Sequence, residues 1–271
     1  MNAFQAFILG LVQGLTEFLP VSSSGHLVLV PWWLGWENPG LAFDALLHWG
    51  TLLAVVIFFW RDWWDMAMAL VRRVRRQPAQ GKDHLLLAIL AGTIPAALLG
   101  FLLEDFFEGL FGRPAAVAVF MLITGILLVL AERWTQTHQQ GRPMEKLSYG
   151  DALLVGAGQA LAIAPGISRS GSTIAAGLFR KLDRPTAARF SFLLGTPIIF
   201  GAGLLKLKDL VEMGAGDMGM LPLLVGFLTA FVSGVLAIRY LLRYLQNHTL
   251  TIFAYYVWGV ALLSLARYFL G

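Results

Sequence analysis

The chain has 271 residues, of which 58% are hydrophobic and only 13% are charged, and its mean hydropathy is +0.71. A soluble domain of this size does not need so much apolar surface, so the composition indicates one integral membrane domain over residues 1–271. The net charge of +4 does not indicate a nucleic-acid partner, because the basic residues lie in loops between apolar segments. No cysteine is present, which excludes disulfides and thiolate metal ligands.

The first apolar segment, residues 3–19, is followed by Pro20 and three serines, and then by a stretch too short to cross a bilayer. Residues 151–180 repeat this pattern. Six other segments are long and apolar enough to span, near residues 43–60, 84–104, 114–131, 187–207, 221–238 and 250–269. The sequence therefore predicts an all-α polytopic membrane protein with six transmembrane helices and two re-entrant broken-helix hairpins, whose tips lie at membrane depth.

The two broken segments are copies of one another. Without a gap, Gly10, Gln13, Leu15, Ser22, Ser24 and Gly25 align with Gly156, Gln159, Leu161, Ser168, Ser170 and Gly171. The copies divide the chain into repeat halves of about residues 1–135 and 147–271. They differ in chemistry, because an acid and a histidine lie in the first copy and an arginine lies in the second.

The basic residues predict the orientation. Of the 20 lysines and arginines, 15 fall in loops that share one face when each hairpin returns to its own side. These loops are residues 61–83, 132–150, 180–189 and 239–249. The positive-inside rule makes this face cytoplasmic and puts both termini outside. Three crossings in each half make the halves antiparallel, as in an inverted-topology repeat.

The first tip carries the candidate acid–base residues. Ionisable groups in membrane segments are costly and are functional candidates by default. Gln13 and Glu17 are spaced i, i+4 and share one helix face. We expect Glu17 and His26 to meet across the break, where a carboxylate would orient the imidazole for general acid–base or nucleophilic work. The plainer alternative is a buried pair that only neutralises itself. Ser23 is a candidate nucleophile.

The second tip predicts an anion site. Its serines and threonine precede an apolar helix, whose N-terminal N–H groups and dipole favour a phosphate. Arg169 adds a guanidinium that fits phosphate oxygens. The predicted phosphate ligands are Arg169, Ser168, Ser170, Gly171, Ser172 and Thr173. The plainer alternative is a capped helix start in which Arg169 pairs with Glu17.

Four further residues are assigned supporting roles. Ser22 and Ser24 would act as hydrogen-bond donors or as structural caps. Gln13 and its copy Gln159 would line the cavity, or bond to a carbonyl of the broken helix.

Asp44 and His48, also spaced i, i+4, are expected to form an interfacial pair at the outer end of a span.

The segments Gln13–His26 and Pro165–Thr173 resemble the two signatures of the undecaprenyl-diphosphate phosphatases, the bacitracin-resistance membrane family, and the resemblance covers nearly the whole chain. It implies hydrolysis of a C55 polyprenyl diphosphate to the monophosphate that carries peptidoglycan precursors in the bacterial plasma membrane, with a pocket that opens outward. It also implies essential roles for Glu17, Ser23, His26 and Arg169.

The resemblance further implies a divalent cation, Mg²⁺ or Ca²⁺, held by a Glu/Gln-x-x-x-Glu pair, which here is Gln13 with Glu17. The glutamine removes one anionic ligand from that pair. Ser23, His26 or a water activated by His26 would attack phosphorus, and the sequence leaves these three open. It also leaves the oligomeric state open, a homodimer included.

An inverted repeat with broken helices is equally typical of secondary transporters. A polyprenyl-phosphate transporter or flippase is therefore the alternative. It would need the charged residues near the midplane, but it would not need a nucleophile beside a base.

Overall fold

The computed structural model describes residues 1–78, 83–137, 141–206 and 219–270. Positions 79–82 and 138–140 belong to two of the predicted cytoplasmic loops, and position 207 ends a predicted span, so those parts of the predictions lie outside the described residues. The described residues form twelve α-helices and one short 3-10 helix. The elements in chain order are α1 (Ala3–Phe18), α2 (Ser23–Leu34), α3 (Leu41–Phe58), α4 (Trp60–Val74), α5 (Leu85–Leu102), α6 (Glu104–Phe111), α7 (Pro114–Thr137), η1 (Met144–Lys146), α8 (Tyr149–Leu161), α9 (Arg169–Phe179), α10 (Arg184–Leu205), α12 (Met220–Tyr244) and α13 (Thr251–Leu270).

Six of these helices are long and apolar enough to cross a membrane: α3, α5, α7, α10, α12 and α13. They coincide with the six predicted spans, with ends displaced by a few residues. The prediction of an all-helical, multi-pass membrane protein is confirmed.

The two predicted breaks are present, and each has a local cause. Pro20 lies two residues after Phe18, the last residue of α1, and α2 begins three residues later at Ser23. Pro165 lies in the connection between α8 and α9. Proline lacks the N–H that would continue the helix, and it also disfavours helical backbone at the preceding residue. The broken helices α1 and α8 are 16 and 13 residues long, shorter than the six spans.

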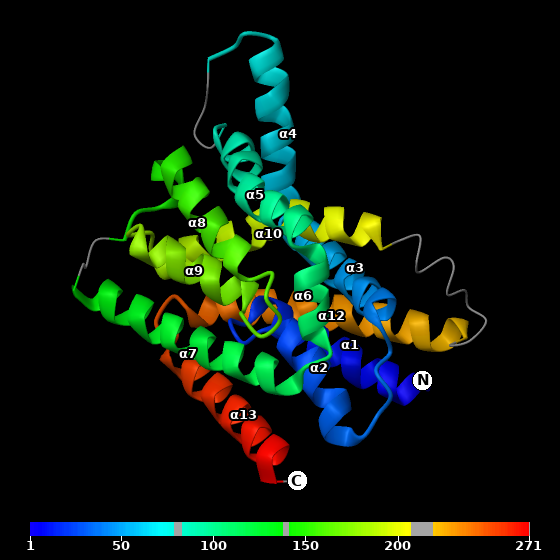
Figure 1. The fold of residues 1–271 in the computed structure, drawn as a ribbon. Helices are drawn as coiled ribbons and strands as arrows, with labels where there is room; N and C mark the ends of the chain where they lie inside the picture. The colour runs from blue at the N-terminus through cyan, green and yellow to red at the C-terminus, as the bar shows by residue number, and fades with distance from the viewer. Residues whose placement is uncertain (79–82, 138–140, 207–218, 271) are drawn as a thin grey trace.

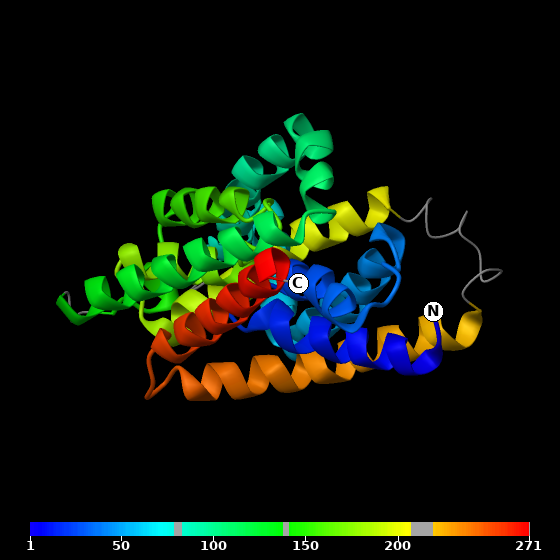
Figure 2. The same cartoon turned by 60° about the horizontal axis from the view of Figure 1, so that its bottom comes forward.

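The helices from the two halves of the chain interleave. Helix α1 lies along α12, α8 lies against α5, and α7 lies along α13 (Figures 1 and 2). Glycines allow the first two contacts, because a Cβ on Gly10 would lie 2.5 Å from the Gly226 carbonyl oxygen and a Cβ on Gly156 would overlap the Gly92 carbonyl. Small residues of this kind let helices in a membrane approach closely. As a result, each broken helix is held by a long helix of the opposite half.

Buried carboxylates tie the predicted cytoplasmic loops to the bundle. Glu132 on α7 accepts hydrogen bonds from Arg184 and from the Leu250 amide, and Asp151 on α8 pairs with Arg142 and Arg180. A buried charge is tolerated when it is paired and hydrogen-bonded in this way.

Candidate functional site between the two helix breaks

The first break presents its serines through a strained turn. Ser22 caps α2, accepting a hydrogen bond from the Gly25 amide at 3.2 Å, and its backbone lies in the left-handed region with φ 73°. That conformation is costly for a residue other than glycine, and such strain is often found at functional sites. The turn brings the Ser23 hydroxyl to Glu17, where Oγ donates to Oε2 at 2.6 Å.

The second break is held by α7. Thr124 donates its hydroxyl to the Gly166 carbonyl and accepts from the Ser168 amide, both at 3.0 Å. Gly166 has φ 103°, and a Cβ there would overlap the Val117 carbonyl, so only glycine fits. Ser168 then caps α9, accepting from the Gly171 amide at 3.0 Å.

The two breaks meet, as the sequence predicted. The Arg169 guanidinium Nη2 lies 2.5 Å from Glu17 Oε1. Ser170 donates its hydroxyl to the Leu19 carbonyl at 3.0 Å, and the Gly166 amide donates to Ser24 Oγ at 3.5 Å. The two breaks are therefore joined by a contact between side chains and by contacts between a side chain and the backbone. The carboxylate of the first half and the cation of the second half share one site.

Helix α10 makes room for the cation. Arg169 Nη1 donates to the Ser191 carbonyl at 3.2 Å, and a Cβ at Gly195 would overlap the guanidinium. Arg169 and Ser23 are partly exposed, whereas Glu17 is 5% exposed. The carboxylate is therefore buried, whereas the serine and the arginine that bond to it are partly exposed.

The expected contact between Glu17 and His26 is wrong. Both ring nitrogens of His26 are occupied elsewhere: Nδ1 donates to the Ser22 carbonyl at 2.7 Å, and Nε2 lies 2.9 Å from the Tyr256 hydroxyl. Because a carbonyl can only accept, Nδ1 carries the proton and a neutral ring accepts the tyrosine proton at Nε2. One turn of α2 separates Ser23 from His26, so the turn that brings the serine to Glu17 directs the imidazole to α13.

His48 contacts Glu17 where His26 was expected. Its Nε2 lies 3.5 Å from Glu17 Oε2, and its Nδ1 donates to the Asp44 backbone carbonyl at 2.7 Å. The expected side-chain pair of Asp44 and His48 is therefore replaced by a bond to the backbone. With Nδ1 committed as a donor, Nε2 presents a proton to the carboxylate only when the ring is a cation.

The sequence analysis did not place His48 or Tyr256 at the site. The signal for His48 was a polar stripe on an apolar span, because Asp44, His48 and Thr51 share one face of α3. Thr51 Oγ1 lies 3.5 Å from Gln13 Nε2, which confirms that this face reaches the first break. Nothing in the sequence connects Tyr256 with His26, since 230 residues separate them.

The serines and threonine at the start of α9 are already bonded within the protein. Ser172 donates to the Ser168 carbonyl at 2.8 Å, and Thr173 donates to the Arg169 carbonyl at 2.7 Å. Both side chains are buried. Since the Gly171 amide is also used, the N–H groups left at the start of α9 are those of Arg169 and Ser170, which have no acceptor within the helix. The Arg169 guanidinium would bind an anion in exchange for Glu17.

Oxygen donors suited to a hard cation lie next to Glu17. Gln13 is fully buried, and its Nε2 donates to Glu17 Oε2 at 3.1 Å, while its Oε1 has no hydrogen-bond partner among the described residues. Asp44 Oδ1 is likewise buried without a partner. No group of three or more histidine, cysteine or acidic side chains in the described ranges forms a complete metal site. Gln159, the copy of Gln13, has both side-chain amide atoms buried and without a hydrogen-bond partner among the described residues.

The fold and site define a class: a multi-pass helical membrane protein with a carboxylate, a serine and an arginine gathered between two broken helices. A family model described as bacitracin resistance protein BacA matches residues 6–263. The undecaprenyl-diphosphatase of Gemmatimonas aurantiaca is 47% identical over 258 residues, covering 94% of each chain. Those of Halothermothrix orenii (44% identity, 99% of this chain and 100% of the relative) and Carboxydothermus hydrogenoformans (47%, 98% of each) are also similar. The chain belongs to the BacA family.

Proposed function

We propose that this protein hydrolyses undecaprenyl diphosphate to undecaprenyl phosphate and inorganic phosphate, and so recycles the lipid carrier and confers resistance to bacitracin. The single observation that carries the proposal is the contact of Ser23, Glu17 and Arg169 across the two breaks. Phosphoryl transfer needs a positioned nucleophile, a proton acceptor and a cation for the developing charge, and these three residues supply them. The family membership and the names of the relatives support the lipid substrate.

The distances favour Ser23 as the nucleophile. In the proposed step, Ser23 Oγ forms a bond to the terminal phosphorus and its proton passes to Glu17 Oε2, 2.6 Å away. The anhydride P–O bond breaks, and its electron pair leaves with the lipid monophosphate. Water then attacks the phosphorus of the phosphoserine and the P–Oγ bond breaks. Glu17 returns its proton to the serine oxygen, and the oxygen and protons of the water leave with the inorganic phosphate. His26 lacks the short contact with an acid that Ser23 has.

Arg169 would exchange partners during the reaction. In the structure its Nη2 pairs with Glu17, so the cation and the anion neutralise each other in a buried setting. A diphosphate that enters the site offers the guanidinium a second anion, and the fork geometry of arginine suits phosphate oxygens. Movement of Arg169 to the phosphate would leave Glu17 free to accept the serine proton.

The donor set next to Glu17 fits a hard divalent cation. Carboxylate and amide oxygens are typical Mg²⁺ and Ca²⁺ ligands, and Gln13 Oε1 is buried beside Glu17 without a partner. We propose that Glu17 and Gln13 hold Mg²⁺ or Ca²⁺. When bound, the cation would neutralise charge on the phosphoryl oxygens. With only one carboxylate in the pair, substrate oxygens and water would supply most of the remaining ligands.

His48 and Tyr256 act as positioning residues in this scheme. His48 lies against the Glu17 oxygen that faces Ser23, so it restrains the carboxylate in the orientation that accepts the serine proton. Tyr256 holds the ring of His26 by a hydrogen bond and by stacking, with ring centroids 5.6 Å apart. In this arrangement His26 braces the Ser22 turn through its bond to the Ser22 carbonyl.

We further propose that α1–α2 and α8–α9 are re-entrant hairpins in an inverted repeat, with basic loops in the cytoplasm and both termini outside. The packing supports this proposal, because α1 rests on α12 of the second half while its copy α8 rests on α5 of the first. The matched glycines Gly10 and Gly156 make these two contacts. Irregular backbone at membrane depth is tolerated where protein surrounds it, as it does here.

Phosphate release by the purified protein in detergent tests the enzymatic proposal, because no transport can be measured without a bilayer. We expect undecaprenyl diphosphate to yield phosphate with the native protein and none with Ser23→Ala. Ser24→Ala is the matched control, since Ser24 is the neighbouring, partly exposed serine, and its hydroxyl contacts Ser22 and the Gly166 amide instead of Glu17. Full turnover by Ser23→Ala would exclude the serine as nucleophile. Transfer of intact lipid across sealed vesicles without hydrolysis would favour the transporter.

A further inference from the structure

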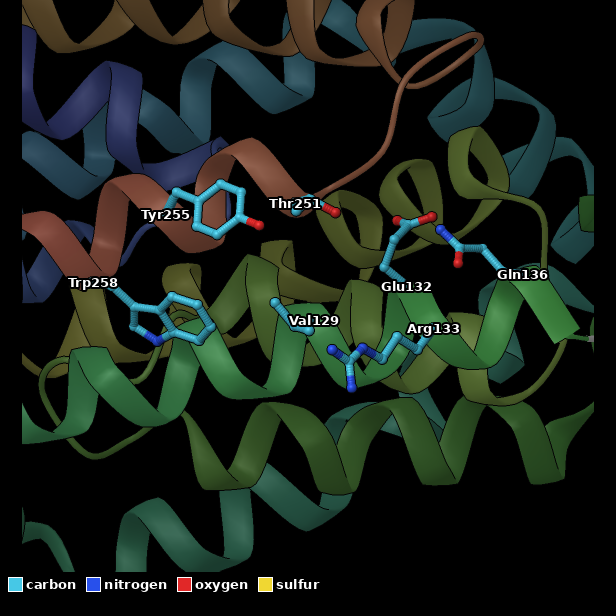
Figure 3. A pocket seen from close by; sticks show the side chains of 7 residues that line it. All are labelled: Val129, Glu132, Arg133, Gln136, Thr251, Tyr255 and Trp258. Carbon is cyan, nitrogen blue, oxygen red and sulfur yellow. The ribbon is translucent and has the colours of Figure 1, made fainter.

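A polar cavity of about 250 Å³ lies between α7 and α13, away from the helix breaks (Figure 3). Figure 3 shows Arg133 and Gln136 on α7, and Thr251 and Tyr255 on the facing α13, with Trp258 toward one end. These residues come from the last turns of α7 and the first turns of α13. The cavity therefore lies at one end of two membrane-spanning helices, at the depth of lipid headgroups.

The polar groups of the cavity are mostly donors without partners. Arg133, Gln136 and Tyr255 are exposed and Thr251 is half-buried, and none of their side chains has a hydrogen bond or an ion pair with a described residue. The acid in the wall, Glu132, is 2% exposed and has both oxygens occupied by Arg184 and the Leu250 amide. The Glu132 charge is thus neutralised by Arg184, which does not line the cavity. What remains in the cavity is one cation and three neutral donors, which is the composition of an anion site.

The flanking surface is apolar on the side toward the hydrocarbon. Ile126 and Leu130 are 50% and 51% exposed, and they are spaced with Arg133 at i, i+4 and i+7, so one face of α7 leads from apolar side chains to the cation. Trp258 closes the inner end of the cavity, since its indole N–H donates to the Leu122 carbonyl at 3.0 Å and its ring covers Gly125. A ligand that fits has an anionic head and acyl chains.

We propose that this cavity binds the phosphodiester of an anionic membrane lipid, with Arg133 as its principal ligand and the acyl chains along Ile126 and Leu130. Basic side chains at a membrane surface attract anionic lipids in general. The difference here is a cavity that adds three donors to the cation, so the lipid is held at one place. The inference does not depend on the proposed hydrolysis.

Native mass spectrometry of the full chain in a zwitterionic detergent tests the proposal. We expect phosphatidylglycerol, whose only charge is the phosphodiester, to be retained, and phosphatidylcholine with the same acyl chains to be lost, because its choline cation would lie close to Arg133. Arg133→Gln should weaken retention of phosphatidylglycerol about tenfold, or about 1.4 kcal/mol, because the variant loses the cation that bonds to the phosphodiester. Gln136→Glu, which adds a negative charge to the cavity, should weaken it by a similar factor. Arg239→Gln is the matched control: it removes an exposed cation from α12, outside the cavity, and should retain the lipid.

Two results would overturn the proposal. One is equal retention of phosphatidylglycerol by the native protein, Arg133→Gln and Gln136→Glu, which would mean that the cavity holds no lipid phosphate. The other is displacement of the lipid by millimolar inorganic phosphate, which would identify a free-phosphate site. Because binding is measured and not turnover, neither result depends on whether the protein hydrolyses undecaprenyl diphosphate.

Discussion

The two helix breaks have similar sequences but use their polar groups differently. At the second break, Ser170, Ser172 and Thr173 are buried and donate to backbone carbonyls, so their role is to build the tip. At the first break, Ser23 is partly exposed and donates to a buried carboxylate. The hydroxyls of the second copy thus stabilise its backbone, and its contribution to the site is the Arg169 guanidinium. The other copy carries the serine and the carboxylate that act in the proposed reaction.

The largest effect should come from removing the acid of the first break. We expect Glu17→Gln to lower kcat at least about a thousandfold, because the amide cannot accept the Ser23 proton and a general base contributes about 10²–10⁴ in rate. The comparison variant in the other break is Ser172→Ala. It removes a hydroxyl that is bonded only to a backbone carbonyl among the described residues, and it should change kcat less than about threefold. Phosphate release at saturating substrate measures both. A large loss in Ser172→Ala would contradict the contrast between the breaks.

The next effect concerns the cation of the second break. Arg169→Lys keeps the charge but loses the fork that reaches both Glu17 and the Ser191 carbonyl. We expect kcat/KM to fall about a hundredfold, or about 2.7 kcal/mol. Gly195→Ala should have a comparable effect, since its methyl group overlaps the guanidinium, whereas Gly201→Ala on the same helix meets open space and should be neutral. Normal kcat/KM in Gly195→Ala would show that Arg169 does not need this position.

Removal of His48 should act through Glu17. We expect His48→Ala to lower kcat about tenfold with KM little changed, because the variant loses an N–H donor that holds the carboxylate in place and not a contact with substrate. His48→Gln should recover most of the rate, since an amide N–H can reach the same oxygen without carrying charge. If His48→Gln were as impaired as His48→Ala, the role of His48 would require its charge and not only its hydrogen bond.

The Mg²⁺ requirement of the protein should depend on the side chain at position 13. A chelator is expected to abolish phosphate release, and Gln13→Glu should lower the Mg²⁺ concentration needed for half-maximal rate, because a second carboxylate joins Glu17. Titration of Mg²⁺ into the metal-free protein measures this shift. Asn2→Asp on α1, a capping position remote from Glu17, is the charge control. An unchanged Mg²⁺ requirement in Gln13→Glu would remove Gln13 from the cation site.

The smallest effect should follow Tyr256→Phe. This change removes one hydroxyl that bonds to His26 Nε2 and leaves the stacked ring in place. A single hydrogen bond is worth about 1 kcal/mol, so we expect a loss of at most about fivefold in kcat. His26→Ala should cost more, because it also removes the brace on the Ser22 carbonyl. Near-normal turnover of His26→Ala would exclude the imidazole from the chemistry.

The sequence was sufficient for the parts of the fold that depend on local patterns. Hydrophobic length predicted the six spans, and Pro20 and Pro165 marked the two breaks. The repeat predicted that Glu17 and Arg169 would share one site. These features are encoded in neighbouring residues, or in the similarity between the two copies.

The sequence was insufficient where side-chain direction decides the contact. The spacing of Glu17 and His26 allowed them to meet, but the left-handed turn at Ser22 directs Ser23 to the acid and His26 to α13. The polar residues of α9 looked like anion ligands, and only the packing showed that their hydroxyls bond to carbonyls. His48 and Tyr256 reach the site through helix packing, which no motif records.

A double-mutant cycle between Glu17 and Arg169 tests most directly whether the two breaks form one site. The melting temperatures of Glu17→Gln, Arg169→Gln and the double variant are compared with that of the native protein. Removing one partner of a buried ion pair costs about 3–5 kcal/mol, since the other charge is left uncompensated. We expect both single variants to melt at a lower temperature than the native protein, and the double variant to be no less stable than the less stable single variant. Additive losses in the double variant would contradict this expectation.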